Sequence, residues 1–258
     1  MLVLSLGGIS EAAIPVTAKA YVVVDAVDGH ILVGKNPRLK LPPASTTKVM
    51  TVLLAKERLS LDDEVLIGRK AASAPNSKAG LTPGARYRVR DLIIASLVSS
   101  SNDAAIALAE AVSGTEREFA NQMNLKARAM GINDTFFVNA TGLPDKKRSQ
   151  YTTAYDLTML MRATMRDKWL DQVMGITQTS ICGNDGKVIV LRSHNKMLWR
   201  TPKFVKGKTG WTNASRHTFV GTNYAPDKSI TFAMLSSQKP WTDIERLASF
   251  GTVLERRR

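Results

Sequence analysis

Cysteine and histidine are scarce in this chain of 258 residues. The single cysteine, Cys182, excludes an internal disulfide framework and a zinc site built on cysteine pairs. The three histidines, His30, His194 and His217, do not have the spacing of a metal-binding motif. We therefore expect no metal site, and we expect Cys182 to be a half-buried small side chain beside a turn.

Long apolar runs are also missing. No run reaches the roughly 18 apolar residues that span a bilayer, so we expect no transmembrane segment and at most a peripheral contact with a cell envelope. Residues 1–18 begin with the apolar stretch MLVLSLGG and lead to small residues at Ala18 and Ala20. This pattern resembles an export signal without its basic first part. An ordinary N-terminal segment that packs on the domain is an equally good interpretation.

Acidic residues are few, and aromatic residues make up only 6% of the chain. The 36 basic and 22 acidic residues give a net charge of +14, which favours anionic surroundings such as nucleic acid, anionic lipid or a carboxylate-rich polymer. The basic residues are scattered, and the chain carries no zinc-finger, RNP or helix-turn-helix motif. We therefore expect no nucleic acid partner.

The periodicity of the sequence places strands at both ends and helices between them. A turn at Asp28-Gly29 predicts an N-terminal hairpin, and a helical period begins at Ser45. Helices are predicted through a lobe at about residues 60–170, followed by β-rich runs and a last helix. This order predicts an α+β fold. One antiparallel sheet combines N- and C-terminal strands in one domain, residues 19–258, and the site lies at the seam with the helical lobe.

Three helix starts in the lobe carry polar capping signals. Asp91 and Asp103 are predicted to cap the helices that follow them. Thr115 and Glu118 have the spacing of a capping box.

A Ser-x-x-Lys pattern is the first candidate for chemistry, but chance alone supplies such patterns. It occurs three times in this chain, at Ser45/Lys48, Ser193/Lys196 and Ser236/Lys239. Residues three apart share a face only on a helix, and only Ser45 begins a long apolar helix. A lysine buried there would lose its charge readily and act as a base. The alternative is that Ser45 caps the helix while Lys48 reaches solvent.

Two further motifs follow in order along the chain. Ser100-Ser101-Asn102 lies between two predicted helices, where polar side chains can project into a cleft. Lys208-Thr209-Gly210 lies on a predicted strand, where the glycine lets a substrate backbone come close. Taken alone, the two motifs have simpler interpretations as a loop cap and an exposed strand end.

Together these three motifs resemble the penicillin-recognising serine hydrolases. The passages PPASTTKVMT, SSSNDAAIALAE and FVKGKTGWT are most similar to the D-alanyl-D-alanine carboxypeptidases among the low-molecular-weight penicillin-binding proteins. The resemblance covers residues 19–255 and implies a fold of the β-lactamase/transpeptidase type.

The resemblance also implies roles for single residues. Ser45 would be the nucleophile and Lys48 its base, while Ser100 would pass a proton to the leaving amine. The remaining catalytic residues would be Asn102 and Lys208. The substrate would be bound by Thr209, Gly210, Trp211 and Lys239. Trp211 stands where relatives often have a polar residue, and Lys239 stands near the place of an arginine that binds the substrate's terminal carboxylate.

The implied activity is a serine D,D-carboxypeptidase that removes the terminal D-alanine from peptidoglycan stem peptides, without a cofactor, outside the cytoplasm of a bacterium. β-Lactams would be covalent inhibitors. A D,D-endopeptidase, a β-lactamase and a binding module without turnover are the alternatives. No Glu-x-x-Leu-Asn segment, which would favour a class A β-lactamase, lies between the second and third motifs.

Overall fold

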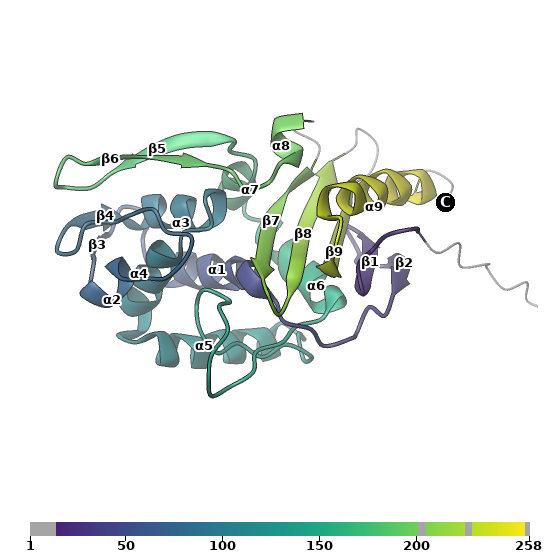
Figure 1. The fold of residues 1–258 in the computed structure, drawn as a ribbon, viewed down its shortest axis with the longest axis horizontal. Coiled ribbons are helices and arrows are strands. Elements are labelled where there is room, and N and C mark those ends of the chain that lie inside the picture. The colour runs from purple at the N-terminus through teal and green to yellow at the C-terminus, as the bar shows by residue number, and fades with distance from the viewer. Residues whose placement is uncertain (1–13, 201–204, 225–228, 256–258) are drawn as a thin grey trace, which may run out of the picture.

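The computed structural model describes residues 14–200, 205–224 and 229–255, and Figure 1 shows a sheet at one end of the molecule and a helical lobe at the other. Residues 1–13, most of the predicted export-signal remnant, lie outside the described residues. Ile14 and Ala18 are buried against the domain, and Thr17 Oγ1 donates to Asp243 Oδ2 at 2.6 Å. Residues 14–18 therefore pack on the domain.

Strands from both ends of the chain form the main sheet, as predicted. Its five strands are antiparallel and run in the order β2-β1-β9-β8-β7. The N-terminal hairpin pairs with the last strand, so β7 is left at the edge that faces the lobe (Figure 1). The strands are β1 (Ala20–Asp25), β2 (Ile31–Lys35), β7 (Val205–Thr212), β8 (Arg216–Tyr224) and β9 (Ser229–Ser237).

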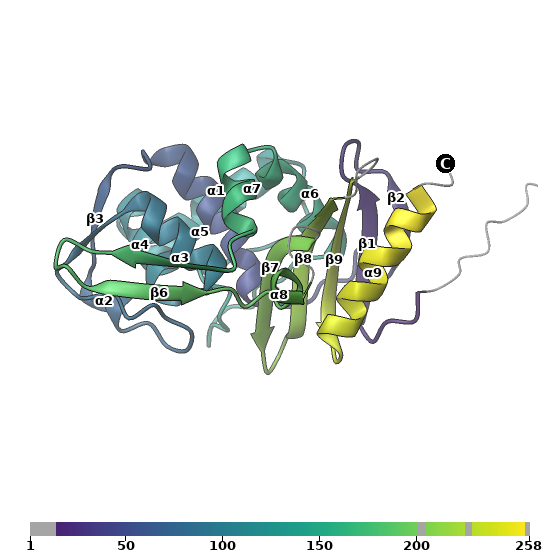
Figure 2. The same cartoon turned by 90° about the horizontal axis from the view of Figure 1, so that it is seen from above.

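Apolar residues cover both faces of this sheet, because successive side chains of a strand point to opposite sides. On one face Val23 and Phe232 belong to a cluster with Ile244 of α9 (Pro240–Glu255). On the other, Val22 and Ala233 belong to the large core that also contains α1 (Lys48–Arg58) and α6 (Ala154–Met165). Figure 2 shows α9 along the sheet on the side away from the lobe.

The lobe is mainly helical, and its described residues also form two small two-stranded antiparallel sheets, β3-β4 and the hairpin β5-β6. The buried helices α3 (Val89–Val98) and α4 (Asn102–Ser113) pack on α1, which runs from the seam into the lobe. The sheet and the lobe thus share α1, and the seam between them is fixed by packing. The lobe elements are β3 (Glu64–Leu66), α2 (Arg69–Ala72), β4 (Arg86–Arg88), α3 (Val89–Val98), α4 (Asn102–Ser113), α5 (Glu116–Ala129), α7 (Lys168–Met174), β5 (Gln178–Cys182) and β6 (Val188–Arg192), with α8 (Met197–Arg200) leading back to the sheet.

Two of the predicted helix caps are wrong. Helix α3 begins before Asp91, which lies in its first turn, and α4 begins at Asn102. The Asp103 carboxylate instead accepts hydrogen bonds from the backbone of residues 79–81, because burial against that loop competes with a local cap. The Thr115 cap is confirmed, since its Oγ1 accepts from Glu118 N at 3.2 Å.

Cys182 differs from its prediction as well. It lies on β5 with its side chain exposed rather than half-buried, because alternate residues of this hairpin face solvent. In the described part of the chain, no helix has the length and apolar character to cross a membrane.

Candidate active site

Ser45 lies in a short 3₁₀ turn, η1 (Ala44–Thr47), directly before α1. Neither η1 nor α1 has a side-chain cap at its start, and the Lys48 side chain is completely buried. The interpretation of Ser45 as a cap with Lys48 in solvent is therefore wrong. The turn presents the Ser45 hydroxyl at the seam between the sheet and the lobe.

Lys48 Nζ contacts three oxygens. It lies 3.1 Å from Ser45 Oγ, 2.7 Å from Asn102 Oδ1 and 3.0 Å from the Thr141 carbonyl. A neutral amine has two N–H donors and one lone pair. Amide and carbonyl oxygens can only accept, so they take the two donors and leave the lone pair for the Ser45 hydroxyl proton. The geometry matches a serine with an adjacent base.

Burial sets the charge of this lysine. Desolvation lowers the pKa of Lys48 well below its ordinary value, and the nearby Lys208 ammonium lowers it further. Asp103 and Glu116 act in the opposite direction but more weakly. Lys48 is thus able to be neutral at a pH where an exposed lysine is charged.

The second and third motifs meet across the seam. Lys208 Nζ donates to Ser100 Oγ at 2.8 Å and to the Thr209 carbonyl at 2.7 Å. Burial lowers the pKa of Lys208 to about 7. Asn102, two residues after Ser100, also donates through Nδ2 to the Pro75 carbonyl at 2.9 Å, which fixes its amide. All five predicted catalytic side chains therefore gather at one place.

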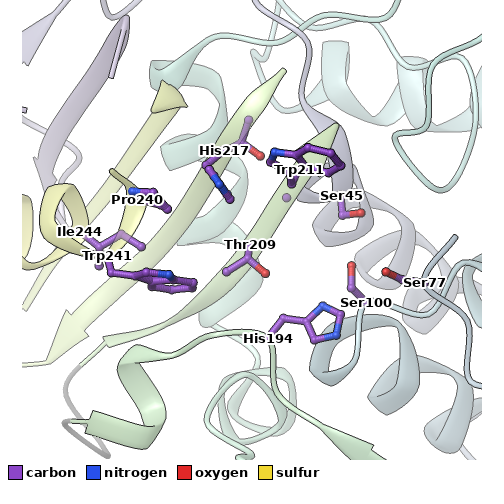
Figure 3. A pocket seen from close by; sticks show the side chains of 12 residues that line it. Ser45, Ser77, Ser100, His194, Thr209, Trp211, His217, Pro240, Trp241 and Ile244 are labelled. Atoms are coloured by element: carbon purple, nitrogen blue, oxygen red, sulfur yellow. The ribbon is translucent and has the colours of Figure 1, made fainter. Parts of the chain in front are cut away.

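A cavity of about 230 Å³ opens at this cluster. In Figure 3 the hydroxyls of Ser45 and Ser100 lie close together at one end of it, while Trp241 lies at the other end, beyond Thr209. Gly210 belongs to the wall as well, because a Cβ there would lie 2.8 Å from Ser45 N. The close approach of β7 to η1 thus requires a glycine, and it brings Trp211 beside the nucleophile.

The cavity also contains residues that the sequence did not single out as site residues. His194, His217 and Trp241 line it. Burial and the two buried lysines lower the pKa of His194 to about 4, so its imidazole is neutral at neutral pH. No sequence motif marks these positions. They reach the cavity only because the segment after β6, the strand β8 and the start of α9 converge on it.

The structure does not bring Lys239 into the cavity wall. Its side chain is exposed, and its backbone N–H donates to Thr17 Oγ1 at 3.0 Å. The next two residues, Pro240 and Trp241, do line the cavity. A substrate contact from Lys239 stays a prediction.

The sequence of the chain matches the family model described as D-alanyl-D-alanine carboxypeptidase over residues 8–238. The chain belongs to this D-alanyl-D-alanine carboxypeptidase family. Family membership and the curated relatives support the prediction that the chain is a hydrolase, a serine-type peptidase.

Curated relatives and solved structures of the family are similar over most of the chain. D-alanyl-D-alanine carboxypeptidase DacB2 of Mycobacterium tuberculosis is 32% identical over 84% of this chain and 74% of its own length. DacF of Bacillus subtilis is 32% identical over 80% of this chain, which spans only 54% of the length of DacF. The crystal structure of a D-alanyl-D-alanine carboxypeptidase from Mycobacterium tuberculosis superposes with a TM-score of 0.90 at 28% identity, covering 96% of both chains. The predicted fold is confirmed.

Proposed function

We propose that this chain is a serine D,D-carboxypeptidase that removes the terminal D-alanine of peptidoglycan stem peptides through an acyl-enzyme on Ser45. The observation that carries the proposal is the contact of the completely buried Lys48 with the Ser45 hydroxyl, with the Lys208–Ser100 pair beside it. Family membership supports the same substrate class. A peptidoglycan substrate supports a location outside the cytoplasm of a bacterium.

Acylation begins when Ser45 Oγ attacks the carbonyl carbon of the scissile D-alanyl-D-alanine bond and its proton passes to Lys48 Nζ. The carbonyl oxygen becomes an oxyanion, and the backbone N–H groups of Ser45 and Trp211 stabilise it. One such donor contributes about 3 kcal/mol in comparable enzymes. Asn102 keeps Lys48 oriented toward the hydroxyl.

The C–N bond then breaks, and the leaving amine takes the proton of Ser100. Lys208, whose ammonium contacts Ser100 Oγ, polarises that hydroxyl and holds the substrate carboxylate together with Thr209. Lys48 returns its proton to Ser100. In the deacylation step, a water molecule gives a proton to Lys48 and attacks the ester carbon of the acyl-enzyme. The bond between that carbon and Ser45 Oγ then breaks, Ser45 Oγ regains the proton from Lys48, and the shortened peptide is released.

Penicillin tests the nucleophile directly. After incubation with penicillin, intact mass spectrometry should find one covalent adduct on the wild type and none on Ser45→Ala. Ser193→Ala, which removes the serine of a second Ser-x-x-Lys pattern, is the matched control and should keep the adduct. A folded wild type that forms no adduct would favour the binding module. Release of D-alanine from a peptide that ends in D-alanyl-D-alanine, measured alongside, separates turnover from binding.

A D,D-endopeptidase is the second candidate, and one observation favours it. The far end of the cavity is lined by Pro240, Trp241 and Ile244, and no arginine lines the cavity among the described residues. An apolar wall of this kind tolerates a longer group on the leaving side. Cross-linked dimeric stem peptides distinguish the two candidates, since only an endopeptidase converts them to monomers.

A further inference from the structure

A second cavity, of about 150 Å³, lies at the end of β7 beyond Trp211. Its walls come from Pro42, just before η1, from Thr212 at the end of β7 and Ala214 in the turn that follows, and from the loop of residues 142–150. Pro42 precedes Ser45 by three residues and Thr212 directly follows Trp211, so the cavity lies along β7 beyond Trp211, away from Thr209. None of the roles derived above uses it.

The loop that forms this cavity is fixed to the catalytic cluster. Thr141, at its start, accepts from Lys48 Nζ through its carbonyl. Gly142 has φ +81° and is packed so tightly that a Cβ would lie 1.8 Å from the Ala44 carbonyl oxygen. The side chain of Asn139 accepts from Gly142 N at 2.8 Å. The position of the cavity relative to Ser45 is therefore set by the same packing that buries Lys48.

The walls of the cavity include one acidic and one basic residue, Asp145 and Arg148, both of which are exposed. Asp145 accepts from the backbone N–H groups of Lys147 and Arg148 at 2.8 and 2.9 Å, and these bonds lower the pKa of its carboxyl. Arg148 also belongs to the wall of the cavity. Gln150 forms part of the wall and is only 8% exposed, and its Oε1 has no hydrogen-bond partner among the described residues. A buried amide oxygen without a partner is costly and is usually matched by a donor.

The direction of a bound peptide follows from the proposed function, on which this inference rests. β7 is an edge strand, and an extended peptide can add to such an edge. The leaving D-alanine lies toward Thr209 and the oxyanion at Trp211, so the acyl side continues toward Thr212. Each extended residue advances about 3.4 Å, so the residue that precedes the penultimate D-alanine lies one step further along β7, toward Thr212 and the second cavity.

We propose that the second cavity binds the side chain of that preceding residue and selects one that ends in an ammonium group beside a carboxylate. Asp145 pairs with the ammonium and Arg148 with the carboxylate. A diamino dicarboxylic residue has this side-chain end, whereas lysine offers the ammonium alone and norleucine offers neither charge.

Three peptides that end in D-alanyl-D-alanine and differ only in this residue test the proposal. The wild type should have its highest kcat/KM with meso-diaminopimelate, a lower value with lysine and the lowest with norleucine. Asp145 and Arg148 are exposed, so solvent screens each ion pair, and the expected steps in kcat/KM are about five-fold. Arg148→Gln should remove the advantage of diaminopimelate over lysine, and Asp145→Asn the advantage of lysine over norleucine.

Lys146→Gln is the matched control, because this lysine belongs to the same loop but does not line the cavity. Lys146→Gln should show the same order of kcat/KM for the three peptides as the wild type. Equal kcat/KM values for all three peptides in the wild type, or an unchanged order in both cavity variants, would overturn the proposed subsite.

Penicillin acylation of Ser45 separates the two proposals. If the adduct forms and D-alanine is released while the side chain of the preceding residue has no effect, the subsite fails and the proposed function stands. If neither reaction occurs, the proposed function fails, and the subsite fails with it.

Discussion

Lys208 Nζ donates a hydrogen bond to Ser100 Oγ at 2.8 Å, although 108 positions separate the two residues in the chain. The bond joins the edge strand of the sheet to the loop between α3 and α4. Ser100 adopts φ +59°, a conformation that is uncommon for a residue with a side chain. The strain turns its hydroxyl toward the lysine, as is often found at functional sites.

Ser100→Gly should be more stable than Ser100→Ala, while both variants should lose activity. Glycine adopts a positive φ without strain. We therefore expect the free energy of unfolding of Ser100→Gly to exceed that of Ser100→Ala by about 1 kcal/mol, which corresponds to a Tm about 3 °C higher. Both variants lose the hydroxyl and should release D-alanine at least about a hundred-fold more slowly. Thermal unfolding and steady-state kinetics check the two parts. Equal Tm values for the two variants would show that the φ of Ser100 carries no strain.

Lys48→Arg tests whether the base has to be neutral. A guanidinium stays protonated in proteins, so it can neither accept the Ser45 proton nor return it. We expect the rate of penicillin acylation to fall by at least about a hundred-fold. Circular dichroism and Tm report whether the variant folds. Acylation at the wild-type rate by a folded variant would contradict the role of Lys48.

The pH profile should follow the two buried lysines. Because the pKa of Lys48 is lowered, kcat/KM rises with pH as its amine becomes neutral. Lys208 has a pKa of about 7, so its ammonium, which holds the substrate carboxylate, is lost as the pH rises through 7. KM should increase above that pH. Lys208→Arg keeps the positive charge and should remove the alkaline increase in KM. The same increase in this variant would exclude Lys208 as its cause.

Stability should also depend on pH. A lysine whose pKa is lowered in the folded state holds fewer protons there than in the unfolded chain. For Lys208 the free energy of unfolding should therefore rise with pH from about 7 toward the unfolded value near 10.4. Lys208→Met should reduce this rise, as urea unfolding at several pH values would reveal. An unchanged pH dependence would mean that other groups dominate it.

Gly210→Ala should disturb the nucleophile through packing. The added Cβ would lie 2.4 Å from Thr218 Oγ1 and 2.8 Å from Ser45 N, so β7 has to move away from η1. Overpacking of this kind costs about 1–3 kcal/mol of stability. Penicillin acylation, measured well below the Tm of the variant, should slow as well. A fully active but less stable variant would show that the contact serves stability alone.

Asp103→Ala should release the loop at residues 79–81. Its carboxylate, which is completely buried, accepts from Ala79 N, Gly80 N and Leu81 N at 2.8 to 3.1 Å. Leaving buried donors without partners costs about 1–3 kcal/mol. Hydrogen exchange should show faster exchange at these three amides. Asp103→Asn keeps an acceptor oxygen and should show a smaller effect. Unchanged exchange in Asp103→Ala would contradict the anchoring role.

The sequence by itself determined the α+β architecture and the five residues that the structure gathers at the seam. Alternation, turn residues and helical period act over a few neighbouring residues, so they can be read locally. The Ser45/Lys48 pair falls in this class, because both residues belong to one turn of chain. The cap at Asp103 was wrong because its carboxylate binds the backbone of a distant loop, and the cap at Asp91 was wrong because the helix begins two residues earlier, at Val89.

Only the tertiary structure decided what surrounds that cluster. His194 and Trp241 enter the cavity, and Lys239 stays outside it, through the way distant segments pack against β7. The burial that lowers the pKa of Lys48 and Lys208 has the same origin. Desolvation depends on every segment that excludes water from a site, and no short stretch of sequence contains that information.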